Sequence, residues 1–129
     1  MESKIMIIEP NQTMRLFLFN YLGHYYRVEA YGSLEDLSKV EKFDQPDLVL
    51  YTITDKDDTY IKTHLVLRNS AIIALTNEDN SEERIKALRM NANDSISKPF
   101  SPEELKIRIK VAIRNREARS KNKSSILAV

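Results

Sequence analysis

Polar side chains stand at the ends of four apolar runs in this sequence. They comprise one carboxylate, two hydroxyls and one ammonium group, on Glu9, Thr52, Thr76 and Lys98. If these groups meet, they could bind an anion, or they could satisfy one another as a polar cluster, since buried charges persist only when they are paired. The elements that carry these residues decide whether they meet.

Short apolar runs alternate along the chain with segments of helical period, which predicts a parallel sheet with helices on both faces. The predicted strands are residues 5–8, 28–31, 47–53, 71–75 and 94–97. Helices are predicted at residues 14–22, 34–40, 59–68 and 81–90, and a last helix begins at residue 102. In a doubly wound α/β sheet, ligands bind outside the carboxyl ends of the strands, so the four polar residues are expected at one rim.

Residue types at the helix ends agree with these boundaries. Gly23 and Asn91 stand where a left-handed C-cap is expected, because glycine and asparagine tolerate that conformation best. N-caps are predicted at Ser33 with Asp36 three residues on, at Asn80 or Ser81, and at Ser101 before Pro102. The buried face of the first helix is predicted to carry Met14, Phe17, Leu18, Tyr21 and Leu22.

The composition excludes several classes of protein. The chain has 129 residues, 42% of them hydrophobic, which suits one domain; we assign it to residues 1–119, with 120–129 as a basic and polar tail or the start of a linker. The absence of cysteine excludes thiolate chemistry, and two glycines are too few for a P-loop or a dinucleotide-binding turn. No apolar run approaches a membrane span, so a cytoplasmic location is expected.

Several motifs, taken in order, resemble the receiver domain of bacterial two-component response regulators, the CheY-like family. The resemblance covers residues 4 to about 117 and is carried by residues 46–50 (PDLVL), 74–76 (ALT), 97–100 (SKPF) and 101–105 (SPEEL). It implies a flavodoxin-like (βα)5 fold with strand order 2-1-3-4-5. It also implies that a lysine and a threonine hold a phosphoryl group on an aspartate after the third strand. In such domains that aspartate and acids after the first strand bind magnesium.

The chain departs from this family pattern at three places. The phosphoacceptor aspartate falls on Thr52, and the paired acids after the first strand fall on Glu9 and Pro10. The aromatic switch residue of the fifth strand falls on Ser95. Phosphoryl transfer to a receiver needs a carboxylate nucleophile and a cation, and magnesium commonly takes one or two carboxylates. We therefore expect a non-enzymatic, phosphorylation-independent receiver without a magnesium cofactor, acting as a signalling and protein-interaction module.

In such a rim Lys98 is expected to pair with Glu9, and Thr52 with Thr76. Two other interpretations stay open. Asp55, in the loop after the third strand, could serve as a displaced acceptor in a working phosphorelay, against the simpler interpretation of a solvated acidic loop. Alternatively, the chain could be the N-terminal regulatory part of a longer DNA-binding transcription regulator.

The last helix is predicted to carry a partner surface. Ile107 and Val111 lie four residues apart beside the buried stripe, and Asp94 and Arg108 resemble an ion pair that crosses a family dimer. A homodimer through the fourth helix, fifth strand and fifth helix is therefore expected; the alternative is that Ile107 and Val111 pack on the fourth helix within one chain. A net charge of +1 and few cations at the carboxyl end do not favour nucleic-acid binding by this domain alone.

Overall fold

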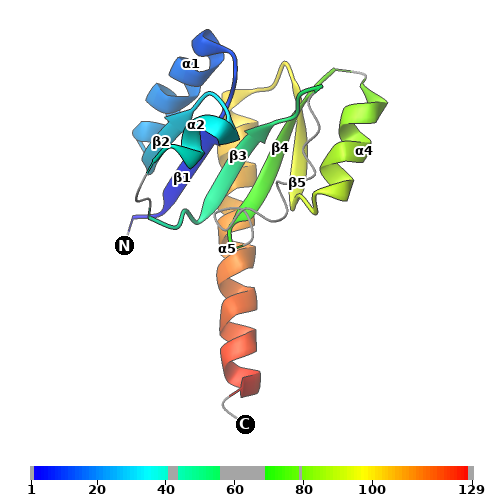
Figure 1. Cartoon of the computed structure of the whole chain (residues 1–129). Coiled ribbons are helices and arrows are strands. Elements are labelled where there is room, and N and C mark those ends of the chain that lie inside the picture. The colour runs from blue at the N-terminus through cyan, green and yellow to red at the C-terminus, as the bar shows by residue number, and fades with distance from the viewer. Residues whose placement is uncertain (1, 41–43, 56–68, 79, 128–129) are drawn as a thin grey trace.

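The five predicted strands form one parallel sheet in the order β2-β1-β3-β4-β5 (Figure 1). The computed structural model describes residues 2–40, 44–55, 69–78 and 80–127, with side chains up to residue 119. The strands are β1 (Lys4–Ile8), β2 (Arg27–Tyr31), β3 (Leu48–Thr52), β4 (Ala71–Asn77) and β5 (Asp94–Lys98). The predicted doubly wound fold and its strand order 2-1-3-4-5 are confirmed.

Helices cover both faces of the sheet, as continuous apolar strands require. They are α1 (Gln12–Gly23), α2 (Leu34–Ser38), α4 (Ser81–Arg89) and α5 (Pro102–Leu127). Alternate strand residues enter two cores: Ile5 and Ile7 pack with α1 and α5, whereas Met6 and Ile8 pack with α2 and α4. The helix predicted at 59–68 lies outside the described residues. No helix in the part of the chain that the structure describes has the length and apolar character needed to cross a membrane.

The helix ends follow the predicted caps with one exception. Ser33 accepts a hydrogen bond from Asp36 N, Asn80 accepts one from Glu83 N, and α5 begins at Pro102. Asn91 has a φ of 59°, in the left-handed region. Gly23 does not, so its predicted left-handed C-cap is wrong: α1 includes Gly23 and ends at His24 in right-handed geometry.

Two helices carry exposed apolar side chains, and α1 differs in this from the predicted pattern of burial. On α1, Leu18 and Leu22 are fully buried, but Phe17 is 43% exposed because it lies at the edge of the buried face. On α4, Ala87 is buried while Ile85 and Leu88 are 46% and 76% exposed. Both helices therefore present large apolar side chains to solvent.

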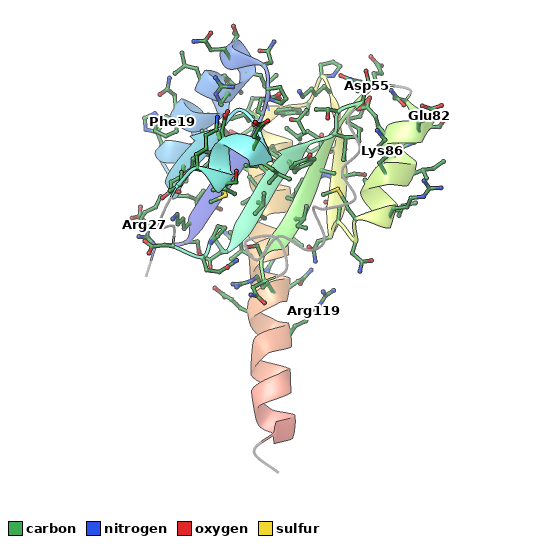
Figure 2. All side chains as sticks on the ribbon, in the orientation of Figure 1. Phe19, Arg27, Asp55, Glu82, Lys86 and Arg119 are labelled. Carbon is green, nitrogen blue, oxygen red and sulfur yellow. The ribbon has the colours of Figure 1, made fainter. Side chains whose placement is uncertain are left out.

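The last helix continues past residue 119, where we predict the domain to end. Near that point Arg116 of α5 donates to Asp47 Oδ1 (3.1 Å) and to the carbonyl of Asn69 (2.7 Å), which ties the helix to the amino ends of β3 and β4. Beyond Arg119 the helix projects from the sheet as far as Leu127 (Figures 1 and 2). Residues 120–127 form helix rather than an irregular tail, since they contain no glycine or proline to end it.

Candidate functional site

Glu9 is a buried carboxylate at the carboxyl end of the sheet. It follows the last residue of β1, and its backbone N–H donates to Tyr31 O of β2 (3.0 Å). Ile8 is in register with Tyr51, so the next residues along these strands, Glu9 and Thr52, are neighbours. Glu9 is 1% exposed, and a charge this deeply buried needs compensation.

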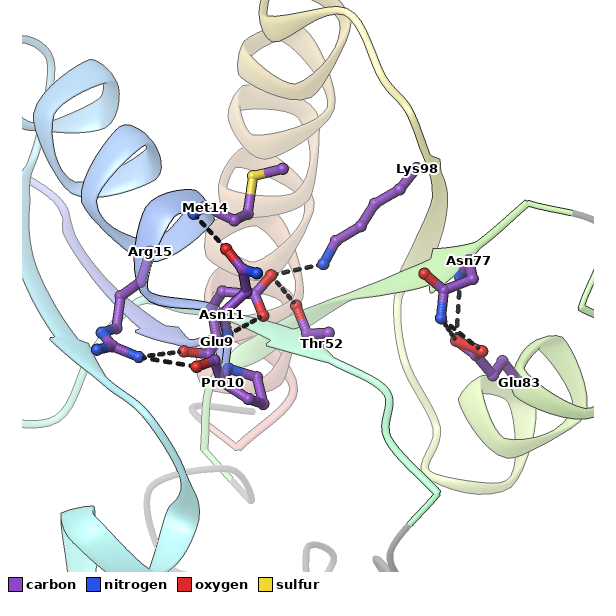
Figure 3. A network of polar contacts seen from close by, with 9 residues as sticks. All are labelled: Glu9, Pro10, Asn11, Met14, Arg15, Thr52, Asn77, Glu83 and Lys98. Carbon is purple, nitrogen blue, oxygen red and sulfur yellow. Dashed lines mark hydrogen bonds and ion pairs between the residues drawn. The ribbon is translucent and has the colours of Figure 1, made fainter.

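Lysine, hydroxyl and backbone donors surround this carboxylate (Figure 3). Lys98 Nζ lies 2.6 Å from Glu9 Oε1, which is the ion pair expected from the sequence. The Thr52 hydroxyl donates to the same oxygen (2.9 Å), and Asn11 N donates to Oε2 (3.1 Å). Both carboxylate oxygens are therefore occupied, and the group is satisfied within the protein. We call Glu9, Thr52 and Lys98 the rim cluster.

Thr76 does not bond to Thr52, so that predicted hydrogen bond is wrong. Thr76 is 2% exposed and lies on β4 in register with Ser97 of β5. Thr52 donates instead to the Glu9 carboxylate, because hydrogen bonds to an ionised acceptor are stronger than those between neutral hydroxyls. Thr76 thus stands near the rim cluster without joining it.

The loop between β1 and α1 has contacts that sequence reasoning missed. Asn11 is the N-cap of α1 and accepts a hydrogen bond from Met14 N (2.8 Å). Arg15 Nη1 donates to the carbonyl of Glu9 (2.7 Å) and, less closely, to that of Pro10 (3.3 Å). Asparagine just before a helical period was the signal for the cap. No sequence signal marked Arg15, because its partners are backbone oxygens.

The side chains of the remaining predicted rim residues form no hydrogen bond with the cluster. Pro10 is exposed and has no side-chain oxygen, and Ser95 is an exposed residue of β5. Asp55 is also exposed and lies near Lys86 on the α4 side of the sheet, where Lys86 donates to the carbonyl of Thr54 (2.8 Å) (Figure 2). Within the described part of the chain Asp55 makes no contact with the rim cluster.

The rim cluster does not suit the magnesium ion that receiver domains bind. Magnesium needs several oxygen ligands in near-octahedral geometry. Glu9 is the one acid of the cluster, its two oxygens already accept three hydrogen bonds, and an ammonium group lies 2.6 Å from one of them. Across residues 2–40, 44–55, 69–78 and 80–119 no group of three acidic, histidine or cysteine side chains is placed to hold a metal.

A second buried carboxylate, Glu83, holds the loop between β4 and α4. It is 6% exposed, and its Oε1 accepts from Asn77 N (3.0 Å) while its Oε2 accepts from Asn77 Nδ2 (3.0 Å) (Figure 3). Oε2 also accepts from Asn80 Nδ2 (2.6 Å). The spacing of Asn80 and Glu83 is that of a capping box, which could have been read from the sequence. The hydrogen bonds from Asn77 to Glu83 could not have been predicted from the sequence.

The residues predicted to form a partner surface differ in their contacts and exposure. Arg108 pairs with Asp94 of the same chain (2.9 Å) and with Glu104 (3.1 Å); hydrogen bonding to Asp94 raises the pKa of Arg108 above its ordinary value. Ile107 and Val111 are 60% and 38% exposed, so they are not buried against α4. Ile107 lines a groove beside the end of α1, and Val111 does not.

Comparison with known proteins supplies the family. The sequence profile described as "Response regulator receiver domain" matches residues 5–110. The chain is 26% identical over 131 residues to the transcriptional regulatory protein GltR of Pseudomonas aeruginosa, covering 96% of this chain and 54% of GltR. It is 29% identical over 128 residues to the regulatory protein VirG of Rhizobium radiobacter, covering 94% and 48%. The chain thus spans about half the length of these curated relatives.

A solved structure of similar sequence agrees with this assignment. The response regulator receiver modulated diguanylate cyclase from Pelobacter carbinolicus is 26% identical and aligns with a TM-score of 0.72, covering 92% of this chain and 98% of that one. The profile match, the parallel sheet in the order 2-1-3-4-5 and the lysine at the end of β5 point the same way. The chain belongs to the response regulator receiver domain family.

Proposed function

We propose that this chain is an atypical receiver domain that does not accept a phosphoryl group and acts as a protein-interaction module. The observation that carries the proposal is the state of Thr52, whose hydroxyl donates to buried Glu9 at the strand end where the family places its acceptor. A neutral hydroxyl is a poor nucleophile for phosphoryl transfer unless a free base takes its proton. Here the nearest acid is itself paired with Lys98.

The ion pair of Lys98 supports the same proposal. In receivers this lysine holds the phosphoryl group, whereas here Glu9 occupies it with a contact of 2.6 Å. An incoming phosphoryl group would have to compete with the Glu9 carboxylate for this lysine. Glu9 thus supplies the negative charge that Lys98 needs without any modification, and the rim stays in one state.

The test is a spectroscopic titration of the full chain. Acetyl phosphate with Mg²⁺, and separately beryllofluoride with Mg²⁺, should leave the ¹⁵N–¹H spectrum unchanged at Thr52, Thr76 and Lys98. A receiver that retains its aspartate serves as the positive control in the same buffers. Saturable shifts at the rim, or a mass increase of one phosphoryl group, would contradict the proposal.

We further infer that the partner surface includes α4 and α5, with a second copy of the chain as the first candidate. Leu88 is 76% exposed, Ile85 46% and Val111 38%, so apolar side chains face solvent on both helices. Sedimentation velocity at micromolar concentration should show a dimer that Leu88→Glu with Val111→Glu abolishes. A monomer at all concentrations would contradict this inference.

A second candidate is the regulatory part of a longer transcription regulator, favoured by the length of the relatives. GltR and VirG are about twice as long as the matched segment, and α5 projects beyond the sheet to Leu127. In that case residues 1–119 form the receiver and the projecting helix leads to the output. A cytoplasmic location goes with either function and stays a prediction. Reading the gene downstream of Val129 tests this candidate.

A further inference from the structure

A groove lies between the end of α1 and the side of α5, away from the rim cluster. It encloses about 590 Å³ and is lined by Tyr25 and Tyr26, by Ser3 just before β1, and by one side of α5. Because Ser3 precedes β1 whereas Glu9 follows it, the groove and the rim cluster lie at opposite ends of the sheet. The groove is therefore separate from the site at which receivers bind phosphate.

The apolar part of the groove is aromatic and exposed. Tyr25 is 47% exposed and Ile107 is 60% exposed. The Tyr25 ring meets Tyr21 edge-on, with ring centroids 5.8 Å apart, and Tyr21 stacks on Phe17 at 5.9 Å. These rings continue the apolar surface from the groove along α1, toward the exposed side of Phe17. A contiguous exposed apolar surface of this kind is typical of a protein-binding site.

The charged part of the groove is a row of three cations on α5. Lys106, Lys110 and Arg114 are spaced by four residues and so lie along one side of the helix, over about 12 Å. The Lys106 ammonium lies 4.1 Å from the Tyr25 ring centroid. Lys110 and Arg114 form no ion pair with any side chain that the structure describes, and Glu117 is the single acid in the lining.

Several cations elsewhere in the domain are paired with carboxylates. Lys98, Arg108 and Arg116 each lie within 3.1 Å of a carboxylate oxygen. The groove thus combines exposed aromatic surface with two exposed cations, Lys110 and Arg114, that form no ion pair with any described side chain. A ligand that complements it must be acidic and must also present apolar side chains.

We propose that this groove docks an acidic, amphipathic segment of a partner protein. An aromatic or aliphatic side chain of the segment inserts between Tyr25 and Ile107, and its carboxylates lie along Lys110 and Arg114. The cation row spans about two turns of helix, which matches a peptide segment rather than a compact small ligand. The groove shares α5 with the proposed dimer face but is lined by Lys110 and Arg114 rather than by Val111.

The test is a titration of the full ¹⁵N-labelled chain with a synthetic helical peptide. The peptide carries leucine and phenylalanine at spacings of three and four residues, separated by glutamates. We expect saturable shifts confined to Tyr25, Tyr26, Ile107, Lys110 and Arg114. A copy with glutamine in place of every glutamate should bind at least tenfold more weakly, because it lacks the charge.

Charge-reversal variants provide the matched control. The pair Lys110→Glu and Arg114→Glu should weaken binding at least tenfold. Lys39→Glu with Arg84→Glu makes an equal change of charge, at the C-cap of α2 and on α4, and should alter binding less than twofold. All four positions tested are exposed, so thermal unfolding reports whether each variant is folded.

Four outcomes would overturn the proposal. Two concern the spectra: the acidic peptide causes no saturable chemical-shift change, or the changes spread over all basic surface. Two concern affinity: the glutamine peptide binds as tightly as the acidic one, or the Lys110→Glu and Arg114→Glu variant binds as tightly as the unchanged chain. Phosphatidylserine vesicles and a single-stranded oligothymidylate are titrated in parallel. If either occupies the groove more tightly than the acidic peptide, the assignment to a protein segment is also wrong.

Discussion

The rim cluster and the groove both place charged groups in partly buried surroundings, and they are opposite in character. At the rim one carboxylate receives three donors, and its lysine is held at 2.6 Å. In the groove Lys110 and Arg114 lack a carboxylate partner among the described side chains, and Ile107 is 60% exposed. A site whose charges and hydrogen-bonding groups are all paired within the chain stabilises the fold. A site with unpaired charges and exposed apolar side chains can still bind a partner. Unused binding capacity therefore lies at the groove and not at the rim.

Removal of Glu9 should have the largest effect on stability. Glu9→Ala leaves Lys98 and Thr52 without their acceptor, so we expect a loss of about 3–5 kcal/mol in the free energy of unfolding. Urea denaturation measures it. The double variant Glu9→Ala with Lys98→Met should recover part of the loss, since no charge remains unpaired. A loss below about 1 kcal/mol would show that the rim cluster is not a stabilising network.

Glu83 should come next, because its partners are neutral. Glu83→Ala removes the acceptor of Asn77 N, Asn77 Nδ2 and Asn80 Nδ2, and we expect a loss of about 1–3 kcal/mol. Amide exchange of Asn77 should accelerate together with the first turn of α4. Glu82→Ala, on the exposed side of the same turn, is the control and should change stability by less than about 0.5 kcal/mol.

Thr52→Val should have a smaller effect on stability and tests the contribution of the hydroxyl independently of Lys98. The variant keeps the shape of the side chain but removes one of the donors to Glu9, so a loss of about 1 kcal/mol is expected. The Lys98 pair should survive, with unchanged chemical shifts for its ammonium group. Loss of the Glu9–Lys98 pair in Thr52→Val would mean that the hydroxyl positions Glu9. The ion pair would then depend on Thr52 and would not hold the rim cluster together by itself.

Substitutions in the groove should cost the least. Lys110→Ala with Arg114→Ala removes exposed charges that form no ion pair among the described side chains, and we expect the free energy of unfolding to change by less than about 0.5 kcal/mol. Thermal denaturation at low and high salt measures this. A marked destabilisation would show that these cations stabilise the fold, and the contrast with the rim would disappear.

Much of the fold could be predicted because its signals are local. Ser33 and Asn80 cap helices through residues three positions away, and Asn91 adopts the left-handed conformation expected of it. The prediction failed at Gly23, since a helix can end in right-handed geometry when the following turn continues its hydrogen bonds, as Tyr25 N and Tyr26 N do with Leu22 O. The prediction for α1 was incomplete, because the helical period does not distinguish the centre of a buried face from its edge, where Phe17 lies.

By itself, the sequence determined the order and type of the elements and the residues that the strand ends bring to one rim, because hydrophobic period and capping act over a few residues. The tertiary structure decided which of those residues bond. Glu9 finds Thr52 at 43 residues' separation and Lys98 at 89, and Thr76, equally expected, is left outside. It also decided that Ile107 faces the groove beside α1. Such choices depend on how strands and helices pack across the sheet, and no local pattern encodes that geometry.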